Sequence, residues 1–395
     1  MRGYAAAPAE PPAVPRGMAL RSETGGGVLE ALAQRPGAIR PGTPYAAIAR
    51  AVLEGEGFHA ASELRVAWLR GEAEELSWLP DLGPDLSLAA LRRMSDEAQA
   101  QPQRFDTPRK QAERDLALAG IDGAALALAE EANAQVFEAI SRHLDAEEAR
   151  ARADVYEAGY RDLAALDWPL AQAGVPAELE RLRAQVSRVR DGRRAALETA
   201  GAARAELAAM GDSRLGGVEG LGGLRDLVAP SPLALMQARV EDRARLARDR
   251  RAANALLDGL DLRRSPEELA ALEEAAGFDG EGSEPGDWSP PEGEPRWTQA
   301  AVAAAEREIG NTARELEALR AAHPETERRR ASAAASAVQA TRLFRSGLLP
   351  AGQALGPVLN ALDAQETELS QRFALARAEL RMAYLRGTLV PGSEL

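Results

Sequence analysis

Apolar positions near the C-terminal part of the chain recur at alternating steps of four and three residues. Between Val358 and Tyr384 this stripe consists of Leu362, Glu366, Leu369, Phe373, Ala376, Leu380 and Ala383. A 3.5-residue spacing is typical of a helix that buries one narrow seam against a neighbouring helix and leaves its other faces exposed. A turn around Gly347 and Pro350 and a long alanine-rich segment precede it. The sequence therefore predicts a helical hairpin with its tip near residues 345–357.

A second hairpin is predicted nearer the N-terminus. Its first helix is expected from about Pro108 to about Asp167, with Thr107 as the N-cap and the proline in the first turn. The tip is expected near residues 168–176, around Gly174. The returning helix has a heptad seam made of Leu179, Leu182, Val186, Val189, Ala196, Ala200, Ala203, Leu207 and Met210. Only Arg193 interrupts this seam.

The remaining segments predict the same order of elements twice. Residues 1–43 are rich in Pro and Gly and are expected to form an extended arm. Further helices are expected at about residues 44–78, 232–261, 265–275 and 297–345, the last with a break at Pro324. Residues 81–106 contain one weak strand signal at Leu82, Leu86 and Leu88, and residues 277–296 read as an acidic loop. The chain is therefore expected to contain two internal repeats, at residues 44–223 and 224–395.

These patterns predict a fold that is all-α or nearly so, built from elongated antiparallel coiled-coil helical hairpins. Aromatic residues are only 4% of the chain, which favours thin seams over a thick globular core. The net charge of −13 argues against nucleic acid as the main partner, because phosphates require a basic face.

Export and membrane signals are scarce. No run of 18 apolar residues is present, so no transmembrane helix is expected. The first residues lack the apolar region of a signal peptide, so the chain is either cytoplasmic or a mature form without its export signal. The absence of cysteine excludes disulfides and thiolate chemistry from this sequence.

No segment predicts a catalytic, cofactor-binding or metal site. His143 and Glu147 have the spacing of a helical metal pair, but the sequence offers no third ligand nearby, and we expect both on the surface. His323 is also expected on the surface, at the predicted helix break. The glycine-rich residues 217–226 lack the preceding strand and the Lys-Ser/Thr pair of a phosphate loop, so they are interpreted as a linker. The chain is not expected to be an enzyme.

Four segments resemble the outer-membrane efflux factor family, the TolC-like proteins. Residues 54–88 resemble the first helix of that family, and residues 105–140 resemble the start of its long helix. Residues 173–186 and 342–369 resemble the two hairpin tips and their returning helices. The resemblance covers about residues 44–210 and 297–390 and rests on pattern, since no invariant motif carries it.

Membership of this family implies a homotrimer whose hairpins surround a conduit in the bacterial cell envelope, in the periplasm or outer membrane. It also implies that the tips contact a periplasmic adaptor protein (a membrane fusion protein) coupled to an inner-membrane transporter. By position, the adaptor-contact residues are Ala173, Gly174, Val175, Phe344, Arg345, Gly347 and Leu348. Glycine is expected at both turns because they require positive φ.

The sequence departs from the family pattern where the membrane β-barrel strands belong. The family has two such strands in each half, whereas residues 81–106 offer one weak signal and residues 277–296 none. We therefore expect these strands to be vestigial or absent. The expected function is that of a TolC-like efflux or secretion factor homologue, and the alternative is a coiled-coil structural or scaffold protein without a conduit.

Overall fold

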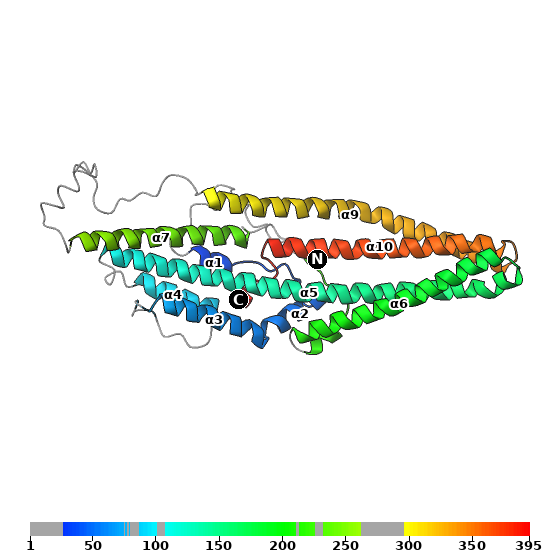
Figure 1. The fold of residues 1–395 in the computed structure, drawn as a ribbon, viewed down its shortest axis with the longest axis horizontal. Helices are drawn as coiled ribbons and strands as arrows, with labels where there is room; N and C mark the ends of the chain where they lie inside the picture. Colours follow the sequence, from blue (N-terminus) through cyan, green and yellow to red (C-terminus); the bar gives the residue numbers. More distant parts are fainter. Residues whose placement is uncertain are drawn as a thin grey trace, which may run out of the picture.

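The computed structural model describes residues 27–74, 76, 79, 87–100, 107–210, 213–225, 232–261 and 296–395. Four long helices form an elongated molecule in which neighbours pack side by side in the order α9, α10, α5, α6 (Figure 1). They are α5 (Pro108–Gln172), α6 (Pro176–Ala209), α9 (Arg296–Arg345) and α10 (Ala351–Leu385). The predicted pair of antiparallel hairpins is confirmed: α5 pairs with α6, and α9 with α10.

Shorter helices surround the end of α5 that is remote from the hairpin turns (Figure 1). They are α1 (Gly27–Ala33), α2 (Pro44–Leu53), α3 (Glu56–Glu72), α4 (Leu88–Ala100) and α7 (Leu233–Asp261), with the 3-10 turns η2 (Ser213–Gly217) and η3 (Gly392–Glu394). Within the described residues there is no β-strand, and Ile39 and Leu224 form an isolated antiparallel bridge. No helix in the described part of the chain is both long enough and apolar enough to cross a bilayer.

The predicted seams are the buried faces of the hairpins. In α6 the buried positions are Leu182, Val189, Ala196, Ala200, Ala203 and Leu207. In α10 the buried seam positions are Leu362, Leu369, Phe373, Leu380 and Ala383. Arg193, which interrupts the α6 seam, forms an ion pair with Glu157 of α5 across 2.9 Å. The seam therefore tolerates arginine because its guanidinium extends to a carboxylate at the edge of the interface.

Two predictions made at prolines are wrong: the end of the first long helix near Asp167, just before Pro169, and the helix break at Pro324. Helix α5 continues through Pro169 to Gln172, so the first turn comprises residues 173–175 and not 168–176. Helix α9 continues through Pro324 to Arg345, and the second turn comprises residues 346–350 because α10 begins at Ala351. A proline inside a helix costs about 3 kcal/mol. Packing along the neighbouring helix outweighs that cost at both positions.

The segments before α5 also differ from the prediction. The single helix expected at 44–78 is two helices, α2 and α3, which are separated at Glu54 and Gly55. Part of the expected extended arm is helix α1. Residues 88–100, where the weak strand signal ended, form helix α4, whose Leu88, Leu91 and Met94 are buried at helical spacing. Residues 1–26, 81–86, 101–106, 265–275 and 277–295 lie outside the described residues.

Polar side chains fasten the two ends of the described chain to each other beside α5. The amide of Asn133 donates to the Ala129 carbonyl, and its oxygen accepts from the backbone N–H of Leu389 at 2.9 Å. Arg35 is only 4% exposed, and it donates to the carbonyls of Gly387 (2.8 Å) and Arg386 at the end of α10. These carbonyls follow the last turn of a helix, where partial negative charge accumulates and a cation is favourable.

Candidate functional site: the paired hairpin turns

Both hairpin turns lie at the same end of the elongated molecule, at the right of Figure 1. The first joins α5 to α6 through residues 173–175, and the second joins α9 to α10 through residues 346–350. We call this end the turn end. It is the part of the molecule that the family resemblance assigns to contact with another protein.

Each turn is made possible by a glycine with a positive φ. Gly174 has φ 66° and Gly347 has φ 74°, which confirms the prediction that both turns require this conformation. At the second turn the N–H of Gly347 donates to the Phe344 carbonyl (3.0 Å), and the N–H of Leu348 donates to the Leu343 carbonyl (2.9 Å). These two bonds form a Schellman motif, which satisfies carbonyls that a helix end leaves without partners.

A common apolar cluster lies beneath the two turns and joins the hairpins. Its buried members are Leu163, Leu166, Leu170, Leu182, Val189, Ala354, Leu355, Val358, Leu359 and Leu362. Val175 from the first turn and Phe344 from the second both pack against this cluster. Since four helices contribute to the same core, the two turns form one continuous surface.

The predicted contact residues divide into two groups. Ala173, Gly174, Arg345, Gly347 and Leu348 are exposed, whereas Val175 and Phe344 are half-buried and anchor their turns to the core. The Leu348 side chain is 75% exposed. Exposed residues at this end therefore supply most of the surface that a partner would touch.

Sequence reasoning missed Trp168, which is 70% exposed one turn before the end of α5. It had been placed within the predicted tip but was not assigned a contact. An exposed tryptophan at the turn end is a feature of binding surfaces, because large aromatic side chains carry much of the energy at protein interfaces.

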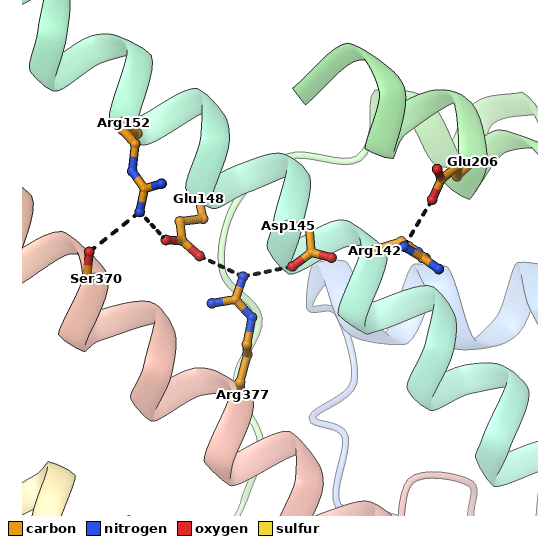
Figure 2. A network of polar contacts seen from close by, with 7 residues as sticks. All are labelled: Arg142, Asp145, Glu148, Arg152, Glu206, Ser370 and Arg377. Atoms are coloured by element: carbon orange, nitrogen blue, oxygen red, sulfur yellow. Dashed lines mark hydrogen bonds and ion pairs between the residues drawn. The ribbon is translucent and has the colours of Figure 1, made fainter. Parts of the chain in front are cut away.

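Ion pairs connect the hairpins farther along α5 (Figure 2). Arg377 of α10 pairs with Asp145 (2.7 Å) and Glu148 (2.6 Å) of α5. Arg152 contacts the same Glu148 at 2.7 Å and the Ser370 hydroxyl at 3.5 Å. A network that shares Glu148 fixes the register of α10 on α5 more strongly than one exposed pair would.

The expectation that His143 lies on the surface is wrong. It is 1% exposed, its Nε2 is 2.8 Å from the Gly220 carbonyl, and its ring meets Tyr45 edge-on. Glu147 accepts from the Gly220 N–H at 3.0 Å. The pair therefore holds the glycine-rich segment against α5, a contact that the interpretation of this segment as a linker did not include. Within the described residues, no three side chains of His, Asp or Glu are placed to hold a metal ion.

Glycine is required within this segment for space. A Cβ added to Gly222 would lie 2.5 Å from the ring of Tyr45, which is itself 2% exposed. The backbone of the segment therefore packs directly on an aromatic ring, and any side chain at this position would displace the ring.

No protein-family model matches the chain, and no curated protein sequence matches it. Solved structures do match, along nearly the whole length of both chains. The outer-membrane channel OprN is 13% identical with a TM-score of 0.61, covering 90% of this chain and 93% of that chain. The CmeC outer membrane channel of Campylobacter jejuni is 10% identical with a TM-score of 0.61, covering 89% and 87%. The open state of the MtrE outer membrane channel of Neisseria gonorrhoeae is 12% identical with a TM-score of 0.55, covering 93% and 89%. The chain therefore has a TolC-like fold.

Proposed function

We propose that this protein is a component of a bacterial envelope efflux or secretion system, located in the periplasm or outer membrane. It acts through contacts of its turn end with a periplasmic adaptor protein, which is coupled to an inner-membrane transporter. The observation that carries the proposal is the joining of two hairpin turns over one apolar cluster in a chain with a TolC-like fold. OprN, CmeC and MtrE are outer-membrane channels, which supports a role in transport.

We further propose that three copies assemble into a ring, and the packing within one chain supports this. If the chain consists of two repeats, α3 corresponds to α7, α5 to α9 and α6 to α10. Helix α5 of the first repeat packs along α7 and α10 of the second. The equivalent partners of α9 would be α3 and α6, which lie on the far side of α5 in the same chain (Figure 1). Only another copy could supply them, and such head-to-tail contacts generate a ring when the rotation closes.

Exposed apolar side chains mark the edge that such a contact would cover. Leu64 and Trp68 on α3 are 75% and 62% exposed, and Leu197 on α6 is 47% exposed. Large exposed apolar side chains such as these, on the two helices that the neighbouring α9 would contact, are typical of a protein–protein interface. Light scattering on the purified protein would measure the number of copies, and Trp68→Glu with Leu64→Glu would shift a trimer towards the monomer.

Site-specific photocross-linking in the native host tests the adaptor contact. A photoreactive residue at Leu348 or Ala173 is expected to cross-link to a periplasmic adaptor protein. The matched control is the same residue at Arg307, which is exposed on α9 far from the turns. Cross-linking of an adaptor only from the turn end supports the proposal. A monomeric protein without such a cross-link would instead favour a coiled-coil scaffold role.

A further inference from the structure

A groove runs along one face of α5 at the end of the molecule that is remote from the turns. Helix α3 lies on one side of α5 here, and α7 lies on the other (Figure 1). The groove has a volume of about 1080 Å³, and α5 forms its floor between Glu113 and Ala127. At 1.5 Å per residue this floor is about 21 Å long. We call this feature the α5 groove.

Small residues of α5 and apolar residues of its neighbours shape the groove. Along the floor the small residues recur at steps of three and four, at Ala117, Gly120, Ala124 and Ala127. Apolar side chains from the three helices surround them, including Leu69, Leu76, Leu116, Ile121 and Val240. The α5 groove is therefore long and mainly apolar, as binding sites for small molecules usually are.

The two walls come close to each other at a pair of glycines. A Cβ added to Gly120 would lie 3.2 Å from Cδ2 of Leu69 in α3, and one added to Gly123 would lie 3.7 Å from Cγ1 of Val240 in α7. Residues three apart on a helix are about 5–6 Å from each other. The floor between the two walls is therefore narrower than a helix, which is about 10–12 Å across with its side chains. A chain of methylene groups fits such a floor, whereas a helix of a partner protein does not.

One end of the α5 groove carries a hydrogen-bond acceptor without a donor. Gln237 of α7 donates its amide to Oε1 of Glu241 at 3.1 Å, whereas its own Oε1 is buried and has no hydrogen-bond partner. Buried polar atoms are normally paired, because an unpaired one costs free energy. Arg65 at this end is already engaged, since it donates to the Ala127 carbonyl at 2.8 Å and to Glu131 at 2.6 Å. A ligand that brings a donor to Gln237 would therefore be stabilised.

The charge at the same end favours a cation. Among the described residues, no basic side chain lies within ion-pair distance of the Glu241 carboxylate. At the opposite end Arg251 pairs with Glu113 at 3.7 Å, and Arg248 is exposed, so water can accept from its donors. The buried oxygen of Gln237 has no such access to water. The Gln237 end is therefore the one that a polar head group would occupy.

The edge that the proposed ring would cover is separate from the α5 groove. The neighbouring α9 would lie on the edge of α3 that carries Leu64 and Trp68. Arg65, Leu69 and Leu76 recur at steps of four and seven on the face of α3 that is turned to α5. Trp68 borders the groove and also belongs to that edge. The groove is thus a site within one chain, and the inference drawn from it goes beyond the proposed function without depending on it.

We infer that the α5 groove binds a single-chain amphiphile with a positively charged head group. The head group donates a hydrogen bond to Oε1 of Gln237 and lies beside the Glu241 carboxylate, because an ammonium group has donors and no acceptor. The alkyl chain lies along the floor towards Leu116 and Leu76, where contact with apolar side chains replaces contact with water. An anionic amphiphile would place its head group against Glu241 or, in the reverse orientation, leave Gln237 facing its alkyl chain.

Calorimetric titration of the purified full-length protein tests the inference. The probe is dodecylammonium, kept below the concentration at which it forms micelles. Three comparison ligands each change one property. Dodecyltrimethylammonium keeps the charge and the chain but has no N–H donor, dodecanoate reverses the charge, and butylammonium shortens the chain. Dodecylammonium is expected to bind saturably, one molecule per chain, and at least tenfold more tightly than each comparison ligand.

Variants of the protein locate the binding. Gln237→Met and Glu241→Gln are each expected to weaken binding of dodecylammonium at least tenfold, because they remove the acceptor and the negative charge. Their matched control, Glu180→Gln, removes an exposed carboxylate of α6 near the turns and is expected to bind as the wild type does. Gly123→Leu fills the floor and is expected to abolish binding, whereas Gly201→Leu makes the same change at an open position of α6 and is expected to have no effect. Circular dichroism confirms that each variant is folded.

Three results would overturn the inference. The first is binding of dodecanoate as tight as that of dodecylammonium, and the second is an unchanged affinity in both Gln237→Met and Glu241→Gln. The third is uptake without saturation that Gly123→Leu does not reduce, which indicates non-specific partitioning. If Gly123→Leu does not fold, the two α7 variants still decide the result. None of these measurements involves the turn end, so the adaptor cross-link from Leu348 can fail without affecting them.

Discussion

Arg35 allows the clearest test of how the described ends of the chain are held. Replacing it by methionine keeps an unbranched side chain of similar length and removes its charge and donors. In the native protein its Nε donates to the Gly387 carbonyl at 2.8 Å, and a second nitrogen donates to the Arg386 carbonyl. The pKa of Arg35 is lowered to about 10 because burial disfavours the charged form, so the side chain is still protonated at neutral pH.

The expected loss of stability follows from three opposing contributions. Hydrogen bonds from a charged donor contribute about 1.5–3 kcal/mol each, and a buried carbonyl left without a donor costs about 1–3 kcal/mol. Removing the cation recovers a burial cost of roughly 3 kcal/mol, which corresponds to the lowered pKa. The smallest values of these contributions leave a net loss, so we expect Arg35→Met to reduce the free energy of unfolding by at least about 2 kcal/mol.

Urea unfolding followed by circular dichroism measures the loss. Hydrogen exchange at the amide of Ala38, which donates to the Thr388 carbonyl, locates it. The control is Arg328→Met on the exposed face of α9, where a surface ion pair with Glu325 contributes less than about 1 kcal/mol. Equal unfolding midpoints for the two variants, or unchanged exchange at Ala38, would refute the assignment of Arg35 as a helix cap.

Three further predictions follow from named contacts. Burial, reinforced by Asp363 and opposed by Arg188, raises the pKa of Glu366 above its usual value, so the ionised side chain destabilises the folded state at neutral pH. Glu366→Gln should therefore raise the melting temperature at pH 7, with a gain that disappears as the pH falls below the ordinary glutamate pKa; a gain equal at all pH values would exclude titration as the cause. Gly222→Ala should cost about 1–3 kcal/mol in urea unfolding because its methyl group would strike the Tyr45 ring, and a stability equal to wild type would show that the ring can move. Gly347→Ala should cost about 1 kcal/mol through its positive φ alone, since no atom lies within 4 Å of the added Cβ, and Gly347→Asn should cost less; a larger loss for asparagine would contradict this reasoning.

The hairpins were predictable because their signal is repeated over many residues. Leu182, Val189 and Leu207 in α6 lie on one heptad seam, and no single substitution could hide that period. The predictions at Pro169 and Pro324 were wrong for the opposite reason. Each rested on one residue with a penalty of about 3 kcal/mol, whereas the packing that outweighs this penalty involves a partner helix remote in sequence.

The candidate site was predicted only in part. Gly174 and Gly347 were recognisable because turns select glycine for its backbone freedom. His143 was misplaced because the partner that buries it, the Gly220 segment, lies 77 residues away along the chain.

Helix α9 also differs from the other long helices in how firmly it is attached. Its buried side chains in the described part of the chain are Thr312, Leu316 and Ala340, and beyond the end of α7 it packs mainly along α10. Its small alanines yield little apolar contact per turn. Of the four long helices, α9 is thus the one that we expect to separate from its neighbours at the lowest energetic cost. Amide exchange should therefore be fastest along α9. Local opening of the described part of the chain is therefore expected to begin at α9, before the α5–α6 hairpin separates.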